Sequence, residues 1–386
     1  MNTCICREEK DGFLVYDFKL NQTLQYKCQN DVLRLYGREN IQIIKNPPTP
    51  HAFSFPLKLF IDISNYCNLN CIHCLSDSSS TQHSFLEESL ILKVVHECYS
   101  HGIFQIKIGG GEPLLYPNFW DIISKIRLIA PNIRLSFTTN GTILSEEDIA
   151  KIKEFSCDVS VSLDGTEQIH NLIRQGNVYN RVLQSIEMLK KQGIYPAVRY
   201  TLMDLNLDCV LPVYHYCFKN DLKLKIRRFK PTSYTQKHLL SYNQKYFAII
   251  EKLRGLKGCD IEDIMKENEN IEKVFYCSHD CGAGFRSIYV DYNGNISPCV
   301  FLGDNYIIGN ISSDSILELW DNSPILEEIR ELKENPSCKN CSRKNICHGE
   351  CLGIKLFYQC DMRKIDPGCY LRSKSHELDV TYRYRH

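Results

Sequence analysis

The chain has 386 residues, of which 43% are apolar and 24% charged, so it can bury a sizeable core and is unlike a disordered chain. Its 46 basic residues balance 46 acidic ones, whereas proteins that follow a phosphate backbone usually carry a basic excess. No apolar run reaches the roughly 18–20 residues of a membrane span, and the polar start over 1–10 is unlike a signal peptide. We therefore expect a cytoplasmic protein that binds neither nucleic acid nor membrane.

The first 55 residues are rich in strand-forming sequence, at 13–19 and 24–26, and end in a proline-rich run typical of a stiff linker. We expect residues 1–55 to form a small strand-rich N-terminal segment. Cys4 and Cys6 lie near its start, where chains are often poorly ordered, so we expect them to be mobile and without a role.

Between residues 56 and 258, strand-like and helix-like stretches alternate. Runs of strand length are followed by stretches whose apolar residues recur every three or four positions, and Ser145, ahead of three acidic residues, is a predicted helix start. Strands are expected at 57–64, 104–109, 133–139, 158–163, 196–202 and 223–229, and helices at 86–99, 119–129, 146–155 and 179–192. Six such units with short connections predict an α/β fold, a partial (β/α)6 barrel with its ligand-binding groups at the carboxyl ends of the strands.

Beyond residue 258 periodicity is weak and cysteine is frequent, with nine of the 20 cysteines between 275 and 371. Disulfide-rich scaffolds are usually short and secreted, so clustered cysteines in a long chain without an export signal indicate metal. We expect residues 259–372 to form a cysteine-rich domain and 373–386 to be a poorly ordered tail.

One group of cysteines follows the first predicted barrel strand. Cys67, Cys71 and Cys74 have the spacing CxxxCxxC on a single loop. Three thiolates can hold three irons of a [4Fe–4S] cluster and leave the fourth iron open, which catalysis requires. A three-ligand zinc site or free thiols are the alternatives for this motif taken alone.

The next three strand ends carry small polar clusters. Any one of them could be an ordinary turn, but their recurrence at successive strand ends indicates a ligand site. The clusters are Gly109 to Pro113, Thr138 to Gly141 and Ser162 to Gly165.

With these motifs, residues 57–230 resemble the core of a radical S-adenosylmethionine (SAM) enzyme. The resemblance implies that Cys67, Cys71 and Cys74 hold a [4Fe–4S] cluster whose open iron chelates the amino and carboxylate groups of SAM. An electron from this cluster would split SAM reductively to a 5′-deoxyadenosyl radical, which abstracts hydrogen from a substrate.

The same resemblance implies residues for SAM itself. Gly110, Gly111 and Glu112 would bind the amino group, and Thr139 and Asn140 belong to the same cofactor-binding set. In the second half of the barrel, Ser162 and Asp164 would contact the carboxylate or ribose, and Arg174 the carboxylate. His73 stands where the family contacts adenine, although a partly exposed loop histidine is an equal interpretation.

The C-terminal cysteines resemble the SPASM extension of radical SAM enzymes, which holds two auxiliary [4Fe–4S] clusters, while zinc ribbons are the alternative for such paired spacings. The resemblance assigns an outer cluster to Cys338, Cys341, Cys347 and Cys369. It assigns an inner cluster to Cys281, Cys299 and Cys351, completed by Cys277. Cys360 is a rival to Cys369. Three [4Fe–4S] clusters and SAM are thus the expected cofactors.

Segments such as 71–76 and 108–113 are similar to the mycofactocin maturase family of ribosomal-peptide maturases. The implied function is modification of a precursor peptide by a C–C or thioether crosslink or by oxidative decarboxylation. Residues 227–234 depart from the family sequence where we expect the substrate, so the substrate is expected to differ.

Several partners follow from the resemblance. They are the precursor peptide, a separate leader-peptide-binding protein, and an electron donor such as flavodoxin or ferredoxin. Residues 1–55 could be a reduced peptide-recognition element that captures the peptide by strand addition, or a clasp on the barrel. The alternatives for function are a SPASM-type enzyme acting on a sulfatase side chain or a porphyrin carboxylate, and a non-catalytic Fe–S or zinc protein.

Overall fold

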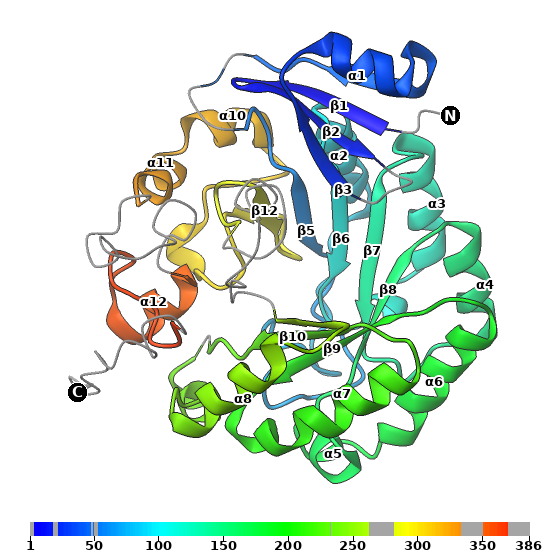
Figure 1. The fold of residues 1–386 in the computed structure, drawn as a ribbon, viewed down its shortest axis with the longest axis vertical. Coiled ribbons are helices and arrows are strands. Elements are labelled where there is room, and N and C mark those ends of the chain that lie inside the picture. The colour runs from blue at the N-terminus through cyan, green and yellow to red at the C-terminus, as the bar shows by residue number, and fades with distance from the viewer. Residues whose placement is uncertain are drawn as a thin grey trace.

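The computed structural model describes residues 4–17, 22–47, 49, 53–231, 233–261, 282–332 and 350–369. It contains two sheets, a small one at the N-terminus and a large curved one with helices on its outer side (Figure 1). None of the helices within these ranges is long and apolar enough to cross a bilayer.

The large sheet has the strand order β11-β10-β9-β8-β7-β6-β5-β12-β13-β14. Its strands are β5 (Lys58–Asp62), β6 (Gln105–Gly109), β7 (Arg134–Thr139), β8 (Asp158–Ser162), β9 (Ala197–Leu202), β10 (Leu224–Arg228), β11 (Cys259–Ile261), β12 (Ser287–Val290), β13 (Asn295–Ser297) and β14 (Gly309–Asn310). The run from β5 to β11 is parallel throughout. The predicted partial barrel with six βα units is therefore confirmed.

The sheet is wider than the sequence predicted. β11 adds a seventh parallel strand beside β10, and β12 pairs in parallel with β5 at the other edge before β13 and β14 continue antiparallel. These short strands lie in the stretch of weak periodicity, where two to four residues are too few to show a pattern. They place the C-terminal region directly beside the first barrel strand.

Helices cover the outer face of the barrel and the C-terminal region. They are α2 (Glu88–Ser100), α3 (Phe119–Ile129), α4 (Glu146–Glu154), α5 (Glu167–Arg174), α6 (Tyr179–Lys191), α7 (Val210–Lys219) and α8 (Gln244–Arg254), followed by α10 (Ile316–Asn322), α11 (Pro324–Glu331) and α12 (Leu352–Gln359). Ser145 begins α4 as predicted, since its hydroxyl accepts from the backbone N–H of Asp148 and the Asp148 carboxylate accepts from the backbone N–H of Ser145.

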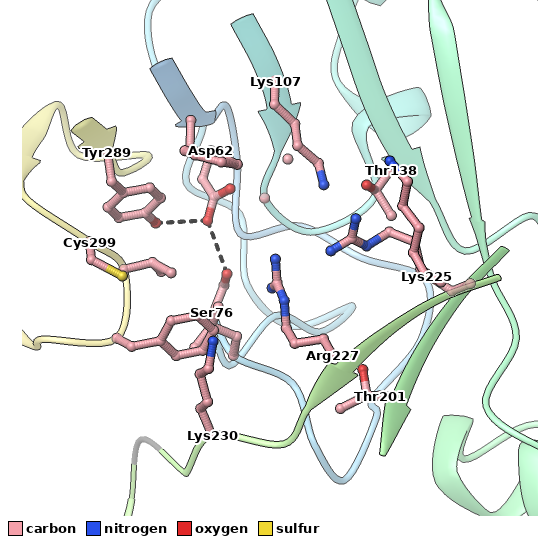
Figure 2. Close-up of a pocket in the computed structure, with 18 of the residues that line it drawn as sticks. Asp62, Ser76, Lys107, Thr138, Thr201, Lys225, Arg227, Lys230, Tyr289 and Cys299 are labelled. Atoms are coloured by element: carbon pink, nitrogen blue, oxygen red, sulfur yellow. Dashed lines mark hydrogen bonds between the residues drawn. The ribbon is translucent and has the colours of Figure 1, made fainter. Parts of the chain in front are cut away.

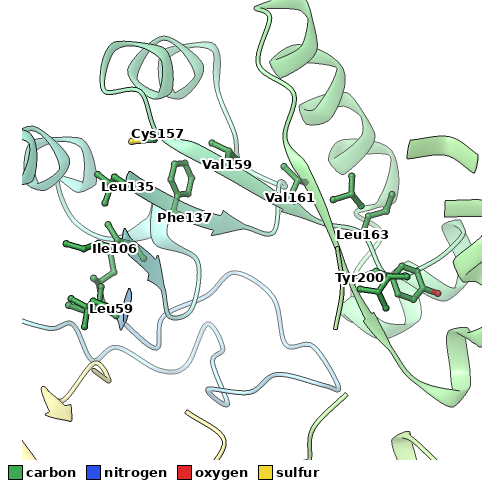
Figure 3. Packing of buried hydrophobic residues seen from close by; sticks show 14 of the residues in the cluster. Leu59, Ile106, Leu135, Phe137, Cys157, Val159, Val161, Leu163 and Tyr200 are labelled. Carbon is green, nitrogen blue, oxygen red and sulfur yellow. The ribbon is translucent and has the colours of Figure 1, made fainter. Parts of the chain in front are cut away.

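Alternate strand residues face opposite sides of the sheet. Leu59, Ile106, Leu135, Phe137 and Val159 are buried between the strands and the outer helices (Figure 3). The intervening residues face the inside of the barrel, and many of them are charged or polar. The hydrophobic core therefore lies outside the barrel wall and leaves the interior available for a polar site.

The N-terminal sheet has the order β3-β2-β1-β4, with β1 (Cys4–Glu9), β2 (Gly12–Asp17), β3 (Gln22–Tyr26) and β4 (Ile41–Ile44), and α1 (Gln29–Tyr36) packs against it. The expectation that Cys4 and Cys6 are mobile was wrong. Both are fully buried in β1, because α1 packs over the face of the sheet on which they lie.

The N-terminal sheet is attached at the amino ends of the barrel strands (Figure 1). The buried Arg7 donates to the carbonyls of Pro56 and Gly102 at 3.0 and 3.3 Å, and Tyr16 stacks on Phe104 just before β6. The cysteine loop after β5 lies at the opposite, carboxyl end of the strands.

Candidate active site

The three clustered cysteines occupy the loop after β5, and this loop is tied to its own return segment. The backbone N–H of Cys67 donates to Ser79 at 3.1 Å, and Asn65 bonds Ser84 and Gln82 through its amide. These contacts order the loop before any ligand binds.

All three cysteines line one cavity of about 540 Å³, within the usual size range of ligand sites. The far wall of the same cavity comes from the C-terminal region and includes Cys299 and Cys351. Figure 2 shows Cys299 and Tyr289 on that side, facing Asp62 and Ser76 from the barrel. The first predicted set and two members of the inner set, Cys299 and Cys351, thus open onto a common space.

Each sulfur of the first set accepts a hydrogen bond from a different part of the barrel. The backbone N–H of Ser78 donates to Cys74 at 3.2 Å, Asn140 Nδ2 to Cys67 at 3.8 Å and Arg174 Nη1 to Cys71 at 3.7 Å. Hydrogen bonds of this kind stabilise cluster-bound thiolates. Burial raises the pKa of Cys67 to about 12, so binding of a cluster would have to displace its proton.

A [4Fe–4S] cluster requires each cysteine to reach a different iron. Within the described ranges, no three Cys, His, Asp or Glu side chains converge on the position of a single ion. Cys67, Cys71 and Cys74 line one cavity from a single loop, and three such sulfurs fit a cluster bound by three cysteines.

Gly110 and Gly111 also line the cavity, but glycine is required at both positions by close contacts within the protein and not by a ligand. A Cβ on Gly110 would lie 2.3 Å from the carbonyl oxygen of Ser64, and one on Gly111 would lie 1.9 Å from that of Tyr66. The bare backbone lets Gly111 N–H donate to Ser64 at 2.8 Å and Glu112 N–H to Tyr66 at 2.9 Å. The two glycines thus join the second strand end to the cysteine loop.

Glu112 does not line the cavity with its neighbours. Its carboxylate is fully buried and accepts from Thr139 Oγ1 and the backbone N–H of Asn140, both at 2.7 Å, and from Leu114 N–H at 3.4 Å. In this arrangement the carboxylate holds the β7 end against the β6 end, and the residues that it orients, Thr139 and Asn140, line the cavity.

Burial of Glu112 predicts a pH dependence of stability. Burial raises its pKa to about 7 despite three hydrogen bonds to the carboxylate. The folded protein therefore binds this proton more tightly than the unfolded chain, and the free energy of unfolding should fall as pH rises from about 4.5 to about 7, by about 3 kcal/mol. Denaturant unfolding across this range should show a flatter profile for Glu112→Gln. If the free energy of unfolding depended on pH equally in the two proteins, the assignment of this dependence to Glu112 would be contradicted.

Beside the cysteine loop, Asp164 and Arg174 form a buried ion pair that also contacts His73. Asp164 accepts from His73 Nε2 at 3.2 Å, from Arg174 Nη2 and from the backbone N–H of Thr201 at 2.7 Å. Burial would raise the pKa of Asp164, but the charge of Arg174 and the contact with His73 hold it below its usual range. Arg174 also bonds Cys71, so this network links the fourth strand end to the cysteine loop.

Several buried polar atoms at the cavity have no hydrogen-bond partner among the described residues. They are His73 Nδ1, Thr138 Oγ1 and Arg174 Nε. Buried polar groups are usually paired, so these atoms mark positions that a polar ligand can satisfy. Ser162 lines the same wall. A donor set of this kind fits a ligand with carboxylate, hydroxyl and adenine groups, as SAM has.

The C-terminal cysteines are only partly within the described ranges. Cys299, Cys351 and Cys369 are described, whereas Cys277, Cys281, Cys338, Cys341 and Cys347 lie outside. Asp366 accepts from the backbone N–H groups of Cys351 at 3.1 Å and Gly368 at 2.7 Å, which brings Cys351 near the segment of Cys369. Cys360 is exposed at the end of α12.

Sequence reasoning missed two groups of functional interest. Arg228, in the stretch expected to face the substrate, instead turns outward and pairs with Asp366 at 3.0 Å, whereas Arg227 and Lys230 line the cavity. Asp62 ends β5 and accepts from Tyr289 at 2.7 Å and Ser76 at 3.1 Å (Figure 2). The alternation of charged and apolar residues along β5 and β10 was the available signal.

Comparison with known proteins gives matches to two family models. Residues 61–217 match the radical SAM superfamily, and residues 281–342 match the SPASM iron–sulfur cluster-binding domain. Among relatives, mycofactocin maturase MftC of Mycobacterium ulcerans is 25% identical over 332 residues, covering 83% of this chain and 89% of that protein. A probable GTP 3′,8-cyclase of Methanococcus aeolicus is 30% identical over 271 residues, 64% of this chain and 87% of that protein.

The fold is also similar to a solved structure. SuiB of Streptococcus suis, bound to the precursor peptide SuiA, has a TM-score of 0.74 at 16% identity, with 94% of this chain and 97% of that chain covered. The two family models together span more than half of the chain, and both coincide with the cysteine-bearing regions around the cavity. The chain therefore belongs to the radical SAM superfamily and carries a C-terminal SPASM iron–sulfur cluster-binding domain.

Proposed function

We propose that this enzyme modifies a ribosomally synthesised precursor peptide. The observation that carries the proposal is the single cavity between the Cys67 loop and the SPASM wall with Cys299 and Cys351. A substrate held there lies between the site of radical formation and an auxiliary cluster. The names of two similar proteins support the peptide class, since MftC is a mycofactocin maturase and SuiB was solved with its precursor peptide.

Membership of the superfamily implies a [4Fe–4S] cluster and SAM. In our proposal Cys67, Cys71 and Cys74 hold the cluster, and Gly110, Gly111 and Ser162 line the SAM site. When bound, the cluster supplies the electron that cleaves SAM to the radical that removes hydrogen from the substrate. The chain's own residues position these groups and exclude water.

Positioning falls to the buried network behind the cavity. Arg174, fixed by Asp164, presents Nε to the SAM carboxylate while Nη1 stays on Cys71. His73 is held by Asp164 through Nε2, and its other ring nitrogen, Nδ1, is available to adenine. Glu112 orients Thr139 and Asn140 through the hydrogen bonds that it accepts, and its role at the amino group of SAM stays a proposal.

The SPASM region binds iron–sulfur clusters, and we propose that it holds two, by the cysteine sets given above. Cys351 opens onto the cavity, and Arg228 and Asp366 fix its segment to β10. Removal of hydrogen leaves an unpaired electron on the substrate, and a buried cluster beside the cavity could accept it. We further propose the domain division 1–55, 56–258, 259–372 and 373–386, and a flavodoxin- or ferredoxin-like electron donor.

The function is tested by incubating the enzyme anaerobically with SAM, a reductant and a short peptide encoded beside its gene. We expect 5′-deoxyadenosine to form and the peptide mass to fall. The fall is about 2 Da per crosslink, since each bond formed removes two hydrogens, or about 46 Da for oxidative decarboxylation, which removes CO2 and two hydrogens. Mass spectrometry of the peptide is the measurement. Two results together would contradict the proposal. SAM would be cleaved while the mass of this peptide stayed unchanged, and a sulfatase-derived peptide would be modified in the same assay.

A further inference from the structure

Asp62 is an acidic residue inside the cavity, and none of the roles proposed above uses it. It ends β5, is half-buried and lines the cavity from the barrel side. Its register partner on β6 is Gly109, where a Cβ would lie only 2.6 Å from Asp62 Oδ1. The missing side chain at Gly109 therefore leaves room for a carboxylate at this strand end.

Two hydroxyl groups from different walls hold this carboxylate by one oxygen. Tyr289 on β12 donates to Asp62 Oδ2 at 2.7 Å, and Ser76, two residues after Cys74, donates to the same oxygen at 3.1 Å. In Figure 2 the other oxygen, Oδ1, points away from these two hydroxyls, toward the side on which Lys107 projects. The carboxylate is thus fixed in orientation between the cysteine loop and the SPASM wall, with Oδ1 directed into the cavity.

The groups around Asp62 leave it able to take up a proton near neutral pH. Burial raises the pKa of Asp62 to about 6, with a smaller rise from Asp291 just beyond β12. The hydroxyls of Tyr289 and Ser76 and the charge of Lys107 act in the opposite direction. A carboxylate with such a pKa is largely ionised at pH 7, and a general base works best when its pKa lies close to the working pH.

The two other buried carboxylates of the site are bound differently. Glu112 accepts from Thr139 and Asn140 within the barrel wall, and Asp164 is paired with Arg174, which holds its pKa below the usual range. A carboxylate with a low pKa is a weak base. The position and the surroundings of Asp62 therefore suit proton transfer better.

Crosslink formation requires a proton acceptor at the substrate. The radical removes one hydrogen atom from the peptide, and joining that carbon to a second C–H or S–H group releases the second hydrogen as a proton and an electron. An oxidised iron–sulfur cluster of the SPASM domain can take the electron, and a base in contact with the peptide must take the proton. Oxidative decarboxylation differs, because an ionised carboxylate leaves as CO2 and no further proton has to be removed.

We propose that Asp62 accepts this proton and that the enzyme accordingly forms a crosslink. The inference rests on the proposed function and specifies its chemistry. The C–H or S–H bond of the second peptide group breaks, its proton goes to Asp62 Oδ1, and the electron reduces the SPASM cluster. The new C–C or C–S bond joins the two peptide atoms. Tyr289 and Ser76 position the carboxylate through Oδ2 and do not themselves react.

The test uses the full-length enzyme with reconstituted clusters, SAM, a reductant and the peptide encoded beside its gene, under anaerobic conditions. The quantity measured is the ratio of modified peptide to 5′-deoxyadenosine. Asp62→Asn keeps the size of the side chain and an acceptor for the two hydroxyls but removes its basicity. We expect this ratio to fall at least about 100-fold, the usual contribution of a general base. The wild-type product should be about 2 Da lighter per crosslink.

Three further variants separate proton transfer from a structural role. Asp62→Glu restores a carboxylate and should recover part of the ratio. Asp208→Asn removes a surface carboxylate that pairs with Lys245 and should leave the ratio unchanged. Tyr289→Phe removes a donor that favours the ionised form of Asp62, so the pKa of Asp62 should rise.

The pH profile gives a readout that a structural contact would not move. In the wild-type enzyme the ratio should fall as pH is lowered through about 6, because a protonated Asp62 cannot accept a second proton. In Tyr289→Phe the same fall should occur at a higher pH. Without turnover, infrared difference spectra of protein with isotopically labelled aspartate should show a carboxyl band that titrates near pH 6 and is missing from Asp62→Asn. Iron content and melting temperature show that the variants are folded, and the Tyr289→Phe profile serves if Asp62→Asn is not.

An unchanged ratio in Asp62→Asn, or equal pH profiles for the wild-type enzyme and Tyr289→Phe, would overturn the inference. A peptide product about 46 Da lighter would also refute it, because that reaction needs no proton acceptor, but the proposed function would stand. If the wild-type enzyme leaves the peptide unmodified, the proposed function itself fails and the inference falls with it.

Discussion

Replacing Cys67, Cys71 and Cys74 together with Ala is expected to abolish 5′-deoxyadenosine formation while iron remains bound elsewhere. The three sulfurs share one cavity wall, and each has its own hydrogen-bond donor. With three [4Fe–4S] clusters the enzyme would hold about twelve iron atoms, and the variant about eight. Anaerobic reconstitution, iron analysis and chromatography of the nucleoside products provide the measurements.

The matched control for this prediction is Cys217→Ala. Cys217 is buried in α7 and belongs to none of the proposed sets, so this substitution should keep the iron content and SAM cleavage. If the triple variant still produces 5′-deoxyadenosine, the catalytic cysteines have been assigned wrongly. Loss of all iron from the triple variant would instead refute the proposal that the auxiliary clusters assemble separately.

The second large effect concerns stability. We expect Asp164→Ala to lower the free energy of unfolding by about 3–5 kcal/mol, because it leaves the Arg174 guanidinium buried without its counter-charge. His73 and the N–H of Thr201 lose their acceptor in the same substitution. Denaturant unfolding near neutral pH is the measurement, since the low pKa of Asp164 keeps it ionised there.

Two comparisons separate loss of this ion pair from a general effect of removing a carboxylate. Asp208→Ala removes the partner of Lys245 at 2.7 Å on the surface and should change stability by less than about 1 kcal/mol. Adding Arg174→Met to Asp164→Ala should restore part of the loss, because the unpaired charge is then gone. A double variant no more stable than Asp164→Ala would show that the destabilisation has another origin.

The electrostatics of the cavity also separate two tasks of the barrel wall. Near the cysteine loop, buried ion pairs and hydrogen bonds hold the groups that would face SAM, as at Asp164 and Glu112. Farther along β9 and β10, the residues are basic and open to the cavity.

The local sequence pattern was sufficient to predict the barrel and the positions of its motifs. The period of the apolar residues located six strands and four helices within a few residues of their observed bounds, because each of these elements buries one whole face. The same periodicity shows that the CxxxCxxC motif and the polar clusters fall at strand ends. Their convergence followed from the rule that carboxyl ends of parallel strands meet at one edge.

Other features depend on partners far away in the chain, and no local spacing encodes them. The partner of Arg228 is one of these features, because Asp366 lies 138 positions away and no local pattern indicates that the two residues meet. Cys4 and Cys6 are buried because α1 packs over their face of the N-terminal sheet, and a residue near a terminus gives no sign of that. The direction of the Glu112 carboxylate likewise depends on donors that arrive with β7.

The sequence by itself thus determined the fold class, the cysteine spacing and the strand ends that carry the site, because these follow from periodicity and chain order. Only the tertiary structure decided which side chains share the cavity and what net charge they present, since a strand residue's surroundings come from neighbouring strands and from the SPASM wall. Charge in a cavity is a sum over elements distant in sequence, so it is visible only after the sheet has closed around it.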